Sequence, residues 1–137
     1  MSAATGRGDG RSLASRIGTL AIAFGVGLVY GILGTVGHRH AWQVGEASIP
    51  WGLALALVGV AALLVGIRLV AGGRAASAAA AAGVVASVAV LSLPGPGGSV
   101  MVLSGPIGTV WAVAPALIGV LVVAWPSLPS RSAARAA

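Results

Sequence analysis

Residues 17–36 read IGTLAIAFGVGLVYGILGTV, a run of 20 residues without a charged side chain. At a rise of about 1.5 Å per residue, a helix of this length extends about 30 Å, the thickness of a bilayer's hydrocarbon core. Three further apolar runs follow at residues 51–69, 75–93 and 107–125, and Arg68 is the one charged residue within them. Four such runs in succession predict four transmembrane helices rather than the buried helices of a soluble protein.

The composition of the whole chain supports this interpretation. Of its 137 residues, 58% are apolar and 7% are charged, and the mean hydropathy is +1.03. A soluble domain carries about 25% charged residues, so the composition excludes an ordinary soluble enzyme and equally a disordered chain. The net charge of +6 does not indicate nucleic-acid binding, because no basic stripe with interleaved aromatic residues accompanies it. The absence of cysteine excludes disulfides and thiolate sites.

The arginines predict the orientation of the chain. If both termini are cytoplasmic, seven of the eight arginines lie inside and only Arg39 lies outside. Such an excess is typical of the cytoplasmic side, and four spans return the chain to the side on which it started. We therefore expect an all-α membrane protein, an antiparallel bundle of four transmembrane helices with both termini inside. Its expected domains are a basic cytoplasmic tail at 1–15, the transmembrane domain at 16–127 and a cytoplasmic tail at 128–137.

The connections between the spans differ in character. Residues 70–74 include Gly72 and Gly73, and they predict a tight cytoplasmic turn between the second and third spans. The first outer connection, residues 37–50, is polar. The second, residues 94–106, is rich in proline and glycine around a short apolar core. It fits either an extended segment on the membrane surface or a shallow re-entrant loop.

Small residues recur at four-residue spacing along one face of the first span. These helix-packing candidates are Ala23, Gly27, Gly31 and Thr35. Where large side chains are missing, the backbone of another helix can approach closely. We expect this face to pack against another helix of the same chain, and an interface between two copies is the alternative.

All four tryptophans stand near the expected ends of spans. Indole rings prefer the interface between membrane and water, so these side chains are expected to anchor the helices there rather than to stack on a ligand. The four anchors are Trp42, Trp51, Trp111 and Trp125. Arg68 stands one turn from the cytoplasmic end of its span, where its long side chain can reach the headgroups.

His38, Arg39 and His40 form the one polar cluster with evident chemistry. Two imidazoles at this spacing could share a metal ion or respond to pH. Glu46 is the one further candidate ligand, whereas a zinc site needs three or four, so we interpret the cluster as a solvated loop at the outer headgroups. No acidic, His, Asn or Gln residue stands well inside a span. The sequence therefore offers no catalytic, cofactor-binding or metal site.

The pattern as a whole resembles a family of small actinobacterial integral membrane proteins of unknown function. The resemblance covers residues 15–127 and rests on the arginine-bearing N-terminal tail, the four spans and two local features. These are Pro50-Trp51-Gly52 at the start of the second span and the Gly/Pro-rich outer loop at 97–106. The resemblance implies a multi-pass protein in the plasma membrane of a GC-rich bacterium, and it supplies no catalytic residues.

The function expected from these observations is structural or accessory, without catalytic activity. Such a protein lies in the lipid bilayer, associates with itself or with a larger membrane protein, and uses neither a cofactor nor nucleic acid. The alternative is a small-solute channel or transporter, whose path would be lined by backbone carbonyls and small residues.

Overall fold

The computed structural model describes residues 3–98, 100 and 104–126 of the chain. Most of them belong to four helices, α1 (Ala3–Gly37), α2 (Trp51–Ala71), α3 (Arg74–Ser92) and α4 (Pro106–Ala124). All four are long and apolar enough to cross a membrane, and in α1 this stretch begins at Leu13. The prediction of four helices with the length and composition of membrane spans is confirmed.

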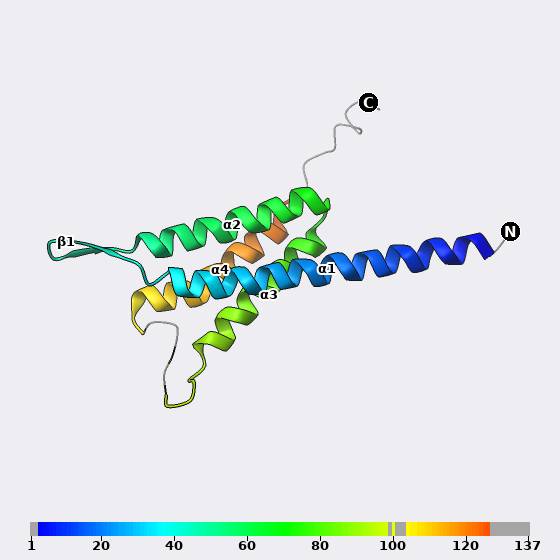
Figure 1. Ribbon diagram of the computed structural model, residues 1–137. Coiled ribbons are helices and arrows are strands. Elements are labelled where there is room, and N and C mark those ends of the chain that lie inside the picture. The colour runs from blue at the N-terminus through cyan, green and yellow to red at the C-terminus, as the bar shows by residue number, and fades with distance from the viewer. Residues whose placement is uncertain (1–2, 99, 101–103, 127–137) are drawn as a thin grey trace, which may run out of the picture.

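The first helix is longer than its membrane-spanning stretch. It begins at Ala3, so it includes most of the segment that was expected as a separate basic tail. The chain has no proline before Pro50, and each residue of this segment therefore keeps the N–H that a continuing helix uses. Figure 1 shows the N-terminal part of α1, in dark blue, extending beyond the other helices. The second expected tail, 128–137, lies outside the described residues.

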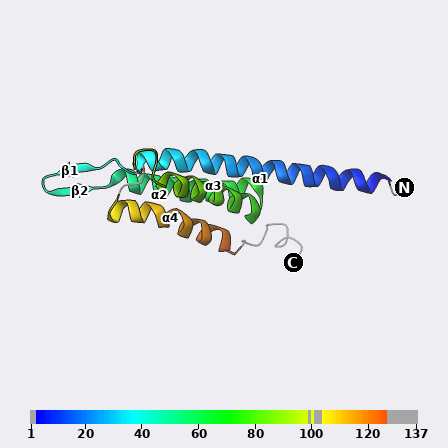
Figure 2. The ribbon, with the colours of Figure 1, turned by 90° about the horizontal axis from the view of Figure 1, so that it is seen from below.

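The helices pack around α3, which contacts each of the other three. Its interface with α1 is the most extensive, whereas α1 contacts α2 much less, and an apolar groove of about 490 Å³ remains between α1 and α2. In Figure 2, α1 and α4 lie on opposite sides of α2 and α3. The core contains Val60 and Leu64 from α2, Ala80 and Val84 from α3, and Trp111 from α4.

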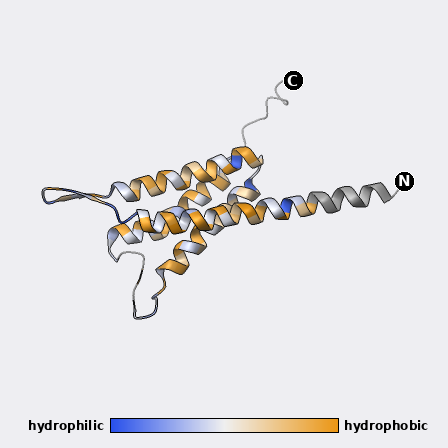
Figure 3. Cartoon of the chain, viewed as in Figure 1, coloured by the Kyte–Doolittle hydropathy of each residue, from blue (hydrophilic) through white to orange (hydrophobic). Residues whose placement is uncertain are grey.

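The outward faces of the helices are apolar as well. Leu55, Val70 and Leu117 are among many large aliphatic side chains that remain exposed on the surface. In Figure 3 the hydrophobic colour recurs along the coloured length of all four helices. Helices that are apolar on all sides are typical of a protein surrounded by lipid.

The first outer connection contains a β-hairpin, which the sequence analysis expected only as a polar loop. Strand β1 (Trp42–Val44) pairs antiparallel with β2 (Ala47–Ile49). The chain reverses at Gly45, whose φ of 64° is a conformation that glycine adopts without steric cost. The hairpin projects beyond the ends of α1 and α2 (Figure 1).

The other two connections differ from each other. Between α2 and α3 the turn is tight, because Gly72 ends α2 in the left-handed conformation with a φ of 69° and α3 begins at Arg74. The second outer connection includes residues 99 and 101–103, which lie outside the described residues. The expectation of either a surface segment or a re-entrant loop concerns these residues, so it lies outside the described part of the chain.

Candidate functional site

Small residues bring the backbones of α1 and α3 into direct contact. A Cβ atom added to Gly27 would overlap the carbonyl oxygen of Ala80, and one added to Gly83 would overlap the carbonyl oxygen of Phe24. Gly31 likewise lies against Ser87 and Val84. The full set of helix-packing candidates, Ala23, Gly27, Gly31 and Thr35, is buried within the chain. Glycine is needed at these contacts because no side chain fits between the two helices.

Polar side chains in the core bond to backbone carbonyls. The Tyr30 hydroxyl donates to the carbonyl of Ala56 over 3.0 Å, and the Ser77 hydroxyl donates to the carbonyl of Leu64 over 3.0 Å. Ser87 donates within its own helix, to Val84, over 2.8 Å. Inside a bilayer a polar group gains most from an internal partner, because no water is available to replace it. Tyr30 and Ser77 therefore tie α1 and α3 to α2.

Trp111 lies in the interior of the protein rather than on its surface. It is 0% exposed, and its Nε1 donates to Thr35 Oγ1 over 3.0 Å. A Cβ added to Gly34 would overlap the indole ring, so the missing side chain of Gly34 makes the space that the ring fills. The expectation that Trp111 anchors the protein at the interface is therefore corrected. The indole is stabilised inside because α1 offers both a gap and a hydrogen-bond acceptor.

His38 is also buried, which corrects its assignment to a solvated loop. Its side chain is 0% exposed and stacks on Trp111, with 5.5 Å between ring centroids and 8° between planes. Nδ1 lies 2.6 Å from the carbonyl oxygen of Thr35 and donates to it, whereas Nε2 has no hydrogen-bond partner in the described part of the chain. Burial lowers the pKa of His38, and the positive charge of Arg39 lowers it further. The hydrogen bond to Thr35 acts in the opposite direction but is a weaker effect than burial.

Trp42, Trp51 and His40 form a second group of aromatic rings at this end. Trp42 is exposed, and Trp51 is half-buried between it and His40, with ring centroids 6.1 Å and 5.7 Å away respectively. Glu46 is exposed at the turn of the hairpin. Among the described residues, no group of three His, Cys, Asp or Glu side chains could hold a metal ion.

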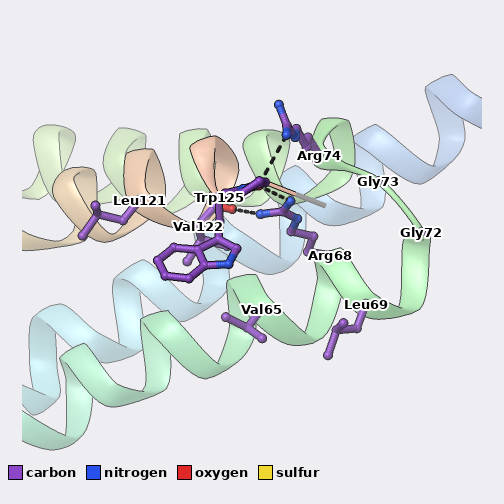
Figure 4. A pocket seen from close by; sticks show the side chains of 10 residues that line it. Val65, Arg68, Leu69, Gly72, Gly73, Arg74, Leu121, Val122 and Trp125 are labelled. Atoms are coloured by element: carbon purple, nitrogen blue, oxygen red, sulfur yellow. Dashed lines mark hydrogen bonds between the residues drawn. The ribbon is translucent and has the colours of Figure 1, made fainter. Parts of the chain in front are cut away.

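The opposite end of the helices contains a cavity of about 530 Å³. It lies between the last turns of α2 and α4 and the turn before α3, and Figure 4 shows two arginines whose hydrogen bonds converge on Trp125. Arg68 donates to the carbonyls of Val122 and Trp125, and Arg74 Nη2 donates to the carbonyl of Trp125 over 3.4 Å. Trp125 itself is 64% exposed, at the end of α4.

The sequence did not predict that these two arginines contact the end of α4. Arg68 was expected only to extend toward the headgroups. Its side chain instead donates to carbonyls at the end of α4, where the last turn of a helix leaves them without partners. The available signal was a basic residue in the last turn of α2. It does not say which helix end the guanidinium meets.

Comparison with known proteins adds no relative. The chain matches no family model, no curated protein and no solved structure. The class of protein therefore follows from the fold alone, and four helices of this length and composition indicate a multi-pass membrane protein.

Proposed function

We propose that this chain is an accessory membrane protein without catalytic activity, which associates with a second copy or with a larger membrane protein. The observation that carries the proposal is the direct contact between the backbones of α1 and α3 at Gly27 and Gly83. Two backbones in contact leave no room for a solute to pass between these helices. The closely packed interior holds the helices together. This leaves the outer surface as the part of the protein that can contact a partner.

The polar groups of the core support the same function. A path for ions or small polar molecules needs groups that can exchange an internal partner for the solute. Here Tyr30 and Ser77 each connect two helices through a backbone carbonyl, and Trp111 fills the space beside Gly34. A solute that passed between these helices would have to break the contacts that hold them together.

We further infer an antiparallel bundle with both termini in the cytoplasm. Successive helices run in opposite directions in Figure 1. One end carries Arg68 and Arg74, and the hairpin with Glu46 stands at the other end of α2. An excess of arginine favours the cytoplasmic side. The resemblance to small actinobacterial membrane proteins supports a plasma membrane of a GC-rich bacterium as the location.

Flux measurements test the proposal against the channel or transporter alternative. The full chain is purified in mild detergent and reconstituted into liposomes that contain a pH dye or a potassium-sensitive dye. We expect the flux of H⁺ and K⁺, and the uptake of labelled sugars and amino acids, to equal those of protein-free liposomes. A saturable flux that depends on the amount of protein would overturn the proposal.

Reciprocal purification tests the accessory role itself. An affinity-tagged chain is expressed in the membrane of its own host and is recovered in mild detergent after cross-linking. We expect a stoichiometric membrane protein or a second copy to remain bound, and a tag on that partner to recover this chain in return. If the tagged chain is recovered only as a monomer, or if a tag on the recovered partner does not recover this chain, the accessory role is contradicted.

A further inference from the structure

The end of the helices that holds the turn between α2 and α3 carries two positive charges close together. Arg68 is half-buried and Arg74 is exposed, and both donate to the same carbonyl oxygen of Trp125. The chain has only two acidic residues. Glu46 stands in the hairpin before α2, whereas Arg68 stands in the last turn of α2, and Asp9 belongs to the N-terminal part of α1, ahead of its membrane-spanning stretch. The arginine pair therefore lacks a neutralising carboxylate among the side chains that the structure describes.

Donors remain available at this site. A guanidinium has five N–H donors, and the bonds to α4 use Nη1 and Nη2 of Arg68 and Nη2 of Arg74. Helix α3 begins at Arg74, and its N-cap residue Gly73 provides no side-chain hydrogen bond. The first amides of α3 therefore add partial positive charge. Open space surrounds the position of a Cβ on Gly73, so the turn leaves room for an anionic group.

The rest of the cavity has a different chemistry. Val65 and Leu69 of α2 and Leu121 of α4 line it, together with the indole of Trp125 (Figure 4). Val65, Leu69 and Leu121 are exposed on the faces of the helices, where they continue into the apolar outer surface. A ligand that satisfies the whole cavity needs an anionic group at one end and an apolar chain at the other.

We propose that this cavity binds an anionic phospholipid. Its phosphate lies between Arg68 and Arg74 and accepts their remaining N–H groups, and one acyl chain follows the apolar wall along Val65 and Leu121. A zwitterionic phospholipid carries its own cation beside the phosphate, so the arginine pair attracts it less. An arginine close to an anionic membrane surface contributes about 1 kcal/mol, which is about fivefold in affinity. The proposal requires a membrane location but not the accessory role.

Native mass spectrometry of the full chain in mild detergent measures this preference. Phosphatidylglycerol and phosphatidylcholine with identical acyl chains are titrated in competition. We expect phosphatidylglycerol to bind at least tenfold more tightly, because two arginines face its phosphate. Equal affinity for the two lipids would overturn the proposal.

Two substitutions of equal charge locate the site. Arg74→Gln is the first choice because this side chain is exposed and its bond to α4 is long, at 3.4 Å, so the fold does not depend on it. We expect it to weaken phosphatidylglycerol binding about fivefold and to leave phosphatidylcholine binding unchanged. Arg39→Gln removes the same charge at the opposite end and serves as the matched control. An equal loss in both variants would mean general attraction to the whole protein and would contradict a site.

A third variant separates a lipid from a free anion. Val65→Trp narrows the apolar part of the cavity and leaves both guanidinium groups in place. We expect this variant to bind phosphatidylglycerol less tightly than the unmodified chain and to keep its binding of inorganic phosphate. If inorganic phosphate displaces phosphatidylglycerol at equal concentration, or if Val65→Trp has no effect on the lipid, the site takes a soluble anion and the proposal is wrong.

Discussion

The Nε1 of Trp111 in α4 donates a hydrogen bond to Thr35 Oγ1 in α1 over 3.0 Å. The same hydroxyl donates to the carbonyl of Gly31 over 2.7 Å, so Thr35 is donor and acceptor at once. Both Thr35 and Trp111 are 0% exposed. The pair therefore ties α1 to α4 by a polar contact at a place where no solvent can replace either group.

Removing the acceptor should destabilise the fold measurably. Thr35→Val keeps the volume of the side chain but leaves the Trp111 N–H buried without a partner. We expect a loss of about 1–2 kcal/mol in the free energy of unfolding, measured by circular dichroism during denaturation in detergent. Thr35→Ser retains the hydroxyl and is the matched control. If Thr35→Val is as stable as Thr35→Ser, this hydrogen bond contributes nothing to the fold.

A single methyl group on Gly27 should separate α1 from α3. Its Cβ would overlap the carbonyl oxygen of Ala80, a backbone atom that cannot rotate away. We expect Gly27→Ala to cost about 1–3 kcal/mol of stability, measured as a lower unfolding temperature in detergent. Gly25→Ala is the matched control on the same helix, because a Cβ there meets nothing within 4 Å.

The control should be neutral or stabilising, since alanine favours a helix over glycine by about 1 kcal/mol. Equal stability of the two alanine variants would show that the α1–α3 contact at Gly27 is not as close as described.

His38 should make the stability of the protein depend on pH. Burial lowers the pKa of His38 in the folded protein below its ordinary value of 6.5. As the pH falls through that value, the unfolded chain takes up a proton before the folded protein does, so stability decreases. The decrease ends once the pH lies below the pKa of folded His38. Above pH 6.5 this residue causes no change, because it is neutral in both states.

Unfolding temperatures between pH 8 and pH 5 check this prediction in the unmodified chain, His38→Phe and the control His40→Gln. We expect the unfolding temperature to fall as the pH drops below 6.5 in the unmodified chain and in His40→Gln. In His38→Phe this dependence on pH should disappear. The opposite assignment, with this dependence lost in His40→Gln, would contradict the role of the buried ring.

The helices follow from the sequence because their cause is local. Long apolar runs without charge predict a span wherever they occur, and the spacing of Gly27 and Gly31 places both on one helical face. The burial of Trp111 does not follow in the same way. A tryptophan near the end of a span fits the membrane interface by its own chemistry, and only the gap at Gly34, on another helix, decides otherwise.

The two ends of the molecule were harder to predict for the same reason. The hairpin has strands of three residues each, too short for alternation to distinguish them from a polar loop. The cavity needs Arg68 and Trp125 to meet across 57 positions of the chain. No local pattern contains that contact, because it depends on how α2 and α4 pack.

Both proposals depend on a chain that crosses the membrane, and the inferred orientation places its arginine-rich end inside. Labelling of single cysteines tests the crossing and the orientation together. The chain has no cysteine of its own. Val44→Cys places a thiol in the hairpin, and Gly73→Cys places one in the turn between α2 and α3, where open space surrounds the position of a Cβ. Intact cells are treated with a maleimide that cannot cross membranes. We predict labelling of Val44→Cys at once and of Gly73→Cys only after the cells are opened. Labelling of Gly73→Cys in intact cells, or equal protection of both positions, would contradict the account.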